Sequence, residues 1–313
     1  MSGSIVDAAA PGRRELVELH VGRLPSGTPI RIRAHVIRGA APGPTALLLG
    51  GVHGDEINGV EVVRRAVCGD LADRVVAGTV VAIPLLNVFG FLNYSRDVPD
   101  GKDVNRSFPG SARGSLASRV AHVLTHRVLP HVDFALDFHT GGNAIYNYPQ
   151  TRFSPDDAAA AALAATFAAP VRLAAKTIPR SLRRTAARLG VPVVVYEGGE
   201  NLRLNPDAVA EAAAGIERVL AARGLLREAR AGVPARAPQY FERHRWTRAT
   251  RAGLFECVAP SGRWVDERQV LGYLRDPYGG EEVALRAARR AFVIGHDNSP
   301  VVSQGDALFH LAW

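Results

Sequence analysis

The sequence predicts an α/β fold in which helices flank a mainly parallel sheet, followed by a small β-rich domain. In the first two thirds of the 313-residue chain, short apolar runs alternate with amphipathic runs, as strands and crossover helices do in parallel sheets. Beyond residue 230 the chain consists of short strand-like runs broken by turns. Because a single core rarely grows beyond about 250 to 300 residues, we expect two units.

Five apolar runs are expected to form strands, and two amphipathic runs carry helix end signals. The strands are expected at 31–37, 45–49, 79–84, 134–138 and 191–196. One helix is expected to begin with Ser154 as its cap, Pro155 at its first position, and to end near residue 169. A second begins at Asn205 with the same pattern and ends near Gly224.

We divide the chain into a disordered leader (1–14), a main domain that carries the candidate site (15–230) and a C-terminal β-rich domain (231–313). The leader lacks the apolar core of a signal peptide, so a cytoplasmic location is expected. The C-terminal segment resembles the barrel-sandwich hammerhead of lipoyl and biotinyl domains. It contains no lysine for a covalent carrier and has Arg289 and Arg290 near the corresponding turn, which leaves a structural or gating role.

Composition argues against several classes of protein. No run approaches the roughly 18 apolar residues of a membrane span. The net charge of +8 comes almost entirely from arginine, with lysine only at Lys102 and Lys176, and no nucleic-acid-binding module is present, so the excess is expected at most to attract anionic substrates. Cys68 and Cys257 are too far apart in sequence to indicate a disulfide framework or a thiolate metal site.

A metal site is predicted where apolar runs end. His53 and Glu56 follow the run that ends at residue 49, three residues apart, and His139 follows the run 134–138. Two imidazoles and a carboxylate are a ligand set of catalytic zinc, which keeps a fourth position open for water. Because ligands gather beyond the carboxyl ends of strands in such sheets, we expect these three residues to meet.

Three further carboxylates are expected to serve this site. Asp137 lies two residues before His139, on the same side of a strand, and could orient the imidazole by accepting its second N–H. Asp55 could do the same for His53. Glu197, at the end of the run 191–196, is placed to act as general base and acid for an attacking water.

A loop upstream of His139 offers a candidate anchor for the substrate. Asn105 and Arg106 supply an amide and a guanidinium side by side. Arginine binds carboxylates in bidentate fashion. Next to a zinc site, this pair predicts a substrate with a carboxylate.

The motifs Gly-Gly-Val-His-Gly-Asp-Glu (50–56), Asp-Val-Asn-Arg (103–106), Asp-Phe-His-Thr-Gly (137–141) and Tyr-Glu-Gly-Gly (196–199), taken together and in this order, resemble those of the succinylglutamate desuccinylase and aspartoacylase family. The resemblance covers nearly the whole chain. It implies the zinc carboxypeptidase-like fold, with a mixed sheet of about eight strands flanked by helices and a small β domain that narrows the entrance. It also implies zinc ligation by His53, Glu56 and His139, proton transfer by Glu197, and carboxylate binding by Asn105 and Arg106.

The chain departs from the aspartoacylase pattern in two places that concern the substrate. Aspartoacylases have an arginine directly after the residue that matches Asn87, where this chain has Val88. We assign the role of stabilising the oxyanion to Arg96 in the following loop. Arg180 resembles a distal substrate arginine of aspartoacylase, but its spacing to Glu197 is longer.

The sequence thus predicts a deacylase with one Zn²⁺ per subunit that hydrolyses the amide bond of a small N-acylated amino acid or related carboxylate. Neither nucleic acid nor a membrane is expected as a partner, and a homo-oligomer is compatible with the sequence. Two alternatives remain open: a metallocarboxypeptidase acting on peptides, and a zinc-binding scaffold without catalysis.

Overall fold

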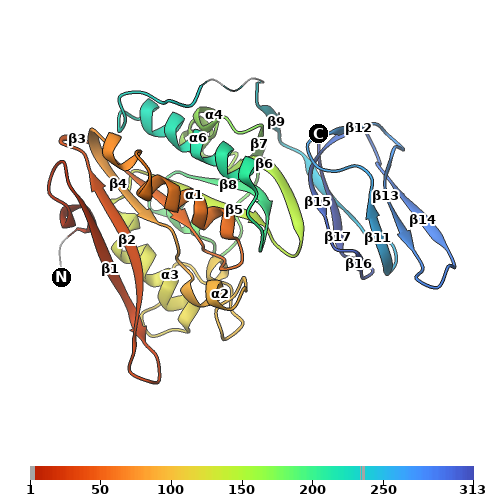
Figure 1. Ribbon diagram of the computed structural model, residues 1–313, viewed down its shortest axis with the longest axis horizontal. Coiled ribbons are helices and arrows are strands. Elements are labelled where there is room, and N and C mark those ends of the chain that lie inside the picture. Colours follow the sequence, from red (N-terminus) through yellow and green to blue (C-terminus); the bar gives the residue numbers. More distant parts are fainter. Residues whose placement is uncertain (1–3, 233, 235–236) are drawn as a thin grey trace.

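The computed structural model describes residues 4–232, 234 and 237–313. Its main domain is a mixed sheet covered by helices on both faces (Figure 1). The strands are β1 (Arg14–Arg23), β2 (Pro29–Arg38), β3 (Ala41–Gly50), β4 (Ala77–Ile83), β5 (Phe134–Gly141), β6 (Ile145–Phe153), β7 (Val171–Ala174) and β8 (Val193–Glu200). The helices are α1 (Ile57–Cys68), α2 (Val88–Leu92), α3 (Leu116–Arg127), α4 (Ala158–Phe167), α5 (Leu182–Arg188) and α6 (Pro206–Ala222).

The sheet has a parallel centre with antiparallel neighbours. Its order is β1-β2-β4-β3-β5-β8-β6, with β4, β3, β5 and β8 parallel to one another and β2 and β6 antiparallel to the strands beside them. Helices α1, α4 and α6 pack on one face in a core with Phe138 and Phe167. Helices α3 and α5 pack on the other in a core with Leu47 and Leu182. Because parallel strands are buried on both faces, β5 has no exposed residue.

The predicted fold class is confirmed, with a difference at the start of the first predicted helix. The first helix begins not at Ser154 but at Ala158, where the Asp157 carboxylate accepts a hydrogen bond of 2.8 Å from the amide of Ala160. Residues 154–157 form a turn instead, since Asp157 offers the cap one turn later. The second helix is α6, with Asn205 as its N-cap.

The amino-terminal segment is more ordered than predicted. Residues Ile5–Ala8 form a short 3-10 helix, η1, capped by the side chain of Ser4. The apolar side chains of Ile5 and Ala9 are buried in the same core as side chains of β1 and β2. The predicted disordered leader is therefore wrong for residues 4–14, and residues 1–3 of it lie outside the described residues. Three other 3-10 helices are η2 (Ala72–Arg74), η3 (Val104–Arg106) and η4 (Leu129–His131).

The C-terminal region joins the main sheet. Its strands are β9 (Gln239–Phe241), β10 (His244–Arg248), β11 (Gly253–Cys257), β12 (Trp264–Val265), β13 (Val270–Arg275), β14 (Glu282–Arg286), β15 (Ala291–Asp297), β16 (Val301–Val302) and β17 (Ala307–Ala312). Strand β15 pairs antiparallel with β6, which extends the main sheet through β17 to β10. A second sheet, β14-β13-β11-β16, completes this part and encloses a core of its own.

Figure 1 shows this region beside the β6 edge of the main sheet. The pairing of β15 with β6 fixes the C-terminal strands relative to the carboxyl ends of the parallel strands. Among the described residues, no helix has the length and apolar character needed to cross a membrane.

Candidate active site

The first part of the site is a tight turn between β3 and α1. Glu56 is the N-cap of α1, and its amide donates to the carbonyl of His53 at 3.4 Å, which places both side chains at the carboxyl edge of the sheet. Gly54 allows this turn to lie against α2, since a Cβ there would come within 1.9 Å of the Gly90 carbonyl carbon.

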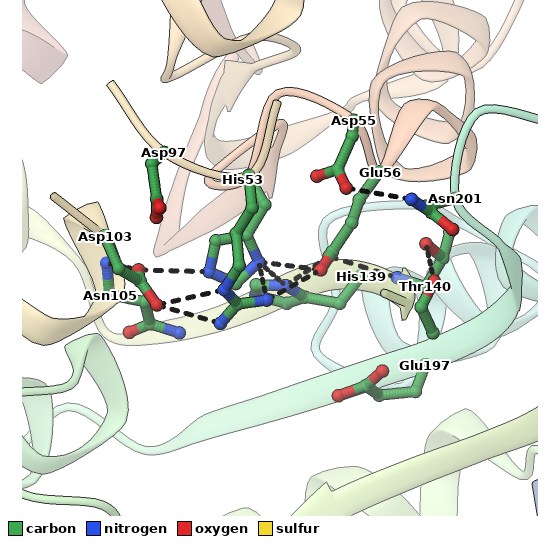
Figure 2. A network of polar contacts seen from close by, with 12 residues as sticks. His53, Asp55, Glu56, Asp97, Asp103, Asn105, His139, Thr140, Glu197 and Asn201 are labelled. Carbon is green, nitrogen blue, oxygen red and sulfur yellow. Dashed lines mark hydrogen bonds and ion pairs between the residues drawn. The ribbon is translucent and has the colours of Figure 1, made fainter. Parts of the chain in front are cut away.

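The turn meets His139 from β5 to form a closed cluster (Figure 2). Glu56 bridges the two imidazoles, with Oε1 2.8 Å from His53 Nδ1 and Oε2 2.7 Å from His139 Nδ1. The two Nδ1 atoms are 3.2 Å apart. One ligand atom from each residue lies within 4.8 Å of the others, and all three side chains are buried. This donor set could hold a metal ion, and its chemistry fits zinc.

A carboxylate holds the outward nitrogen of each imidazole. Asp137 Oδ2 lies 3.0 Å from His139 Nε2, and Asp103 Oδ1 lies 3.3 Å from His53 Nε2. Such contacts fix the tautomer and orientation of metal-binding histidines. The sequence suggested Asp55 as the partner of His53. Its carboxylate instead accepts a hydrogen bond of 3.0 Å from Asn201.

The pKa shifts within the cluster favour an ionised Glu56 and protonated imidazoles. Burial opposes ionisation of Glu56, yet the two imidazoles hold the pKa of its carboxyl well below the usual range. Burial also opposes protonation of His139, yet Asp137 and Glu56 raise its pKa well above the ordinary value. The pKa of His53 is likewise raised by Glu56 and Asp103 against the effect of burial.

Arg96 lies at the edge of this cluster. Its Nε and Nη2 donate to Asp103 Oδ2 at 3.1 and 2.9 Å, and its Nη1 lies 3.3 Å from Glu56 Oε1. Asn87, the buried N-cap of α2, fixes the loop by donating to the carbonyl of Arg96 at 3.2 Å. The structure therefore brings Arg96 beside the predicted ligands.

Glu197 enters the site from β8. It is the register partner of His139 on β5, so it lies on the neighbouring strand at the same level. Its Oε2 accepts a hydrogen bond of 2.8 Å from Asn147, and its Oε1 pairs with Arg152 Nη1 at 3.1 Å. Both donors belong to β6. Gly199, with φ +84°, lies two residues further along β8, where the register with β5 shifts, and this left-handed conformation favours glycine.

The three residues expected to bind the substrate lie in different settings. Asn105 lines the cavity, and its Oδ1 accepts a hydrogen bond of 2.9 Å from the Leu182 amide at the start of α5. Arg106 also lines the cavity, with Nη1 bonded to the Asn105 carbonyl at 2.8 Å. Arg180 is not among the cavity-lining residues; it has φ +59°, and its carbonyl accepts from the Phe108 amide.

Of the site residues predicted from the sequence, all except Asp55 and Arg180 line one cavity of about 820 Å³. Sequence reasoning missed several of its lining residues, which come from β6, α5 and the C-terminal region. They are Asn147, Arg152, Arg183, Trp246, Asp297 and Asp306. Arg152 and Asn147 lie on one β6 strand, but no motif distinguished them from other polar strand residues.

Comparisons with known proteins agree with this geometry. Residues 42–223 match the catalytic domain of succinylglutamate desuccinylase/aspartoacylase. The N-alpha-acetyl-L-2,4-diaminobutyric acid deacetylase of Halomonas elongata is 30% identical over 283 residues, which cover 86% of this chain and 82% of that protein.

Two solved structures resemble the whole chain. A succinylglutamate desuccinylase/aspartoacylase from Rhodobacter sphaeroides has a TM-score of 0.85 and 27% identity, covering 96% of this chain and 95% of that one. The product-bound ectoine utilisation protein EutE (DoeB) from Ruegeria pomeroyi also has a TM-score of 0.85, with 25% identity and coverage of 96% and 94%. The order of the motifs, the fold and these similarities together show that the chain belongs to the succinylglutamate desuccinylase/aspartoacylase family.

Proposed function

We propose that the protein is a zinc-dependent deacylase that hydrolyses the amide bond of a small N-acylated amino acid. The observation that carries this proposal is the presence of the His53, Glu56 and His139 cluster and of Glu197 in one cavity. Metal ligands alone would suit a scaffold. A carboxylate outside the ligand set, on the strand beside His139, supplies the base that hydrolysis needs.

One Zn²⁺ per subunit would be held by His53, Glu56 and His139. When bound, zinc polarises a carbonyl and lowers the pKa of a water molecule. The residues fit this role because the three donors already converge while Asp137 and Asp103 hold the outward imidazole nitrogens.

The remaining steps belong to the side chains around the cluster. Glu197 takes a proton from the water that attacks the amide carbon and delivers it to the departing amine. Arg96, whose Nη1 faces Glu56, stabilises the negative charge that develops on the carbonyl oxygen. Asn105 and Arg106 of η3, which contacts the start of α5 through the Leu182 amide, bind the substrate carboxylate.

The cavity supports a small substrate. Its volume of about 820 Å³ lies in the range of small-molecule sites, roughly 300 to 1,000 Å³. Trp246, Asp297 and Asp306 of the C-terminal region also line it, and we expect this part of the wall to limit the access of a peptide chain. The relative from Halomonas elongata, a deacetylase of an acetylated diamino acid, supports acetyl as the acyl group.

The test compares zinc-loaded wild-type protein with the Glu197→Gln variant on N-acetyl amino acids and on dipeptides. We expect hydrolysis of the N-acetyl amino acids only. Loss of a general base should lower kcat by about 10² to 10⁴-fold. The zinc content of the variant should stay unchanged, since Glu197 is not a ligand.

Glu200→Gln is the matched control, because Glu200 lies on the same strand but bonds to Asn298 instead of facing the cavity. It should retain wild-type turnover. Preferential cleavage of dipeptides would favour the peptidase. Stoichiometric zinc without any hydrolysis would favour the non-catalytic scaffold.

A further inference from the structure

Strand β6 holds the proposed base at both of its carboxylate oxygens. Asn147 donates to Glu197 Oε2 at 2.8 Å, and Arg152 Nη1 lies 3.1 Å from Glu197 Oε1. Glu197 is the register partner of Gln150, two residues before Arg152, so these three side chains project from the same face of the sheet. Contacts at two different oxygens restrict the rotation of the carboxylate more than one contact can.

The ion pair between Arg152 and Glu197 has no competitor on the arginine side. Among the described residues, Glu197 is the only carboxylate that forms an ion pair with Arg152. The two side chains are 24% and 14% exposed, so water screens their attraction only in part. Burial and the charge of Arg152 lower the pKa of His310 and of His244, which favours uncharged imidazoles nearby. The charge of Arg152 therefore acts on the proposed base.

A buried glutamine ties Arg152 to the C-terminal region. Gln150 is fully buried, and its Nε2 donates to the carbonyl oxygen of Ile294 on β15 at 3.0 Å. Its Oε1 accepts a hydrogen bond of 3.4 Å from Arg152 Nε. The contacts thus run from β15 through Gln150 and Arg152 to Glu197, across three neighbouring strands of the main sheet.

Without Arg152, other cations would compete for the carboxylate. Arg96 and Arg183 line the same cavity, and the buried Nη1 of Arg183 has no hydrogen-bond partner among the described residues. A Glu197 released by Arg152 would turn toward such a donor, because a partly buried charge that loses its partner is costly. Proton transfer requires a base within hydrogen-bond reach of the attacking water, and a displacement of about 1 Å can cost about 10²-fold in rate.

We propose that Arg152 is a positioning residue that holds the Glu197 carboxylate for proton transfer, and that Gln150 transmits this restraint from the C-terminal region. The inference rests on the proposed function, since it takes Glu197 as the base. It assigns to the C-terminal region a part in the reaction itself, in addition to its contribution to the cavity wall.

The first test separates kcat from KM in zinc-loaded full-length protein with N-acetyl-L-alanine as substrate. Arg152→Met should lower kcat about 10 to 10²-fold, because a hydrogen bond to a charged group is lost. KM should change less than about threefold, and Arg152→Lys should recover part of kcat because it keeps the positive charge. A rise in KM with an unchanged kcat would overturn the inference and show that Arg152 binds the substrate.

A double-mutant cycle asks whether Arg152 acts through Glu197. Added to Glu197→Gln, Arg152→Met should lower the residual kcat by less than about twofold, since the group that it positions is already gone. The same 10 to 10²-fold loss in both backgrounds would overturn the inference. It would mean that Arg152 acts independently of the proposed base.

Gln150→Met tests the connection to β15, because it keeps a long side chain but removes both hydrogen bonds. It should lower kcat about 2 to 10-fold, and by less than about twofold when Arg152→Met is already present. A wild-type kcat would overturn the part assigned to the C-terminal region.

Arg172→Met is the matched control for Arg152→Met. Arg172 is a half-buried arginine of the neighbouring strand β7, where it contacts the ring of Tyr240 and does not line the cavity. The variant should retain wild-type kcat and KM. A loss equal to that of Arg152→Met would overturn the inference, because any arginine of this part of the sheet would then have the same effect.

Crystal structures separate this inference from the proposed function. In zinc-loaded Arg152→Met the Glu197 carboxylate should be displaced or occupy two conformers, whereas in zinc-loaded Arg172→Met it should lie as in wild type. If the wild-type protein hydrolyses no N-acetyl amino acid, the proposed function fails, yet these structures still show whether Arg152 fixes Glu197. An unmoved, single conformer of Glu197 in Arg152→Met would overturn the positioning role.

Discussion

The cavity has two sides that differ in how far the protein satisfies its own polar groups. On the metal side, Glu56 bridges His53 and His139, and carboxylates hold both outward nitrogens. On the substrate side, Arg183 keeps a buried donor without a partner in the described chain. The imidazole nitrogens of the metal side all have partners within the protein, whereas a guanidinium nitrogen of the substrate side has none among the described residues.

This difference shows how the two sides divide their work. A ligand set must hold its geometry before the metal arrives, which requires partners within the protein. A substrate site must instead keep donors available for a group that comes and goes. We therefore expect changes on the metal side to abolish the reaction and changes on the substrate side to alter selectivity.

The largest effect is expected from His139→Ala. This change removes one of the three proposed ligands and leaves Glu56 and Asp137 without their shared partner. Zinc binding and hydrolysis should both be lost, while the far-ultraviolet circular dichroism should stay close to wild type because the strand backbone is unchanged. Metal analysis after dialysis measures the first and a substrate assay the second.

A milder variant and a control accompany His139→Ala. Asp137→Asn keeps the ligand but weakens its support, so it should lower zinc affinity by about 10 to 100-fold. His126→Ala removes an exposed imidazole of α3 and should change neither property. Tight zinc retained by His139→Ala would contradict the ligand assignment.

A smaller effect is expected from Asn147→Ala, which removes a hydrogen bond to Glu197. Asn147 is buried and donates to Glu197 Oε2 at 2.8 Å, so it positions the proposed base. Loss of a hydrogen bond to a charged group should lower kcat by about 10 to 10²-fold. KM should change little, because the orientation of Glu197 matters during proton transfer rather than in substrate binding.

Asn298→Ala is the control, since Asn298 makes the same kind of bond to Glu200 on the same strand. It should leave kcat for a neutral N-acetyl amino acid unchanged. A rise in KM without a fall in kcat for Asn147→Ala would show that Asn147 contacts the substrate instead of orienting Glu197.

The metal side could be predicted from the sequence for a physical reason. Its residues follow buried strands, and parallel strands place their carboxyl ends together, so His53, Glu56 and His139 had to meet once the strands were identified. Asp137 followed from the alternation of side chains along β5. Local sequence patterns were therefore enough to predict the fold class and the proximity of the proposed ligands.

The substrate side depends on packing between distant segments. Arg183 faces the cavity because α5 docks on Asn105, which is 77 residues earlier in the chain than Leu182. Asp297 reaches the cavity because β15 pairs with β6, and no local pattern predicts that pairing. The role of Asp103 beside His53 likewise follows from a long-range loop contact.

The smallest effect is expected from Asp297→Asn, at the C-terminal wall of the cavity. Asp297 is 5% exposed, and its Oδ1 accepts a hydrogen bond of 2.8 Å from the Ser299 amide. Among the described residues, no basic side chain pairs with this carboxylate, so a cationic substrate side chain would be its counter-ion. The variant should lower the kcat/KM ratio of Nα-acetyl-L-2,4-diaminobutyric acid to its neutral isostere Nα-acetyl-L-norvaline by roughly tenfold.

The kcat/KM ratio of the two substrates should also depend on pH, through the ionisation of Asp297. Burial, together with the nearby Asp306, raises the pKa of Asp297, so its negative charge is present at high pH and is lost on acidification at a higher pH than for an ordinary aspartate. The ratio in wild type should therefore fall as the pH is lowered. Taking the ratio cancels titrations that affect both substrates equally.

Asp276→Asn is the control and should leave the ratio unchanged. Like Asp297, Asp276 accepts a hydrogen bond from a backbone amide, that of Tyr278 at 2.8 Å, but it does not line the cavity. A ratio that Asp297→Asn does not alter at any pH would show that the charge of Asp297 does not select the substrate.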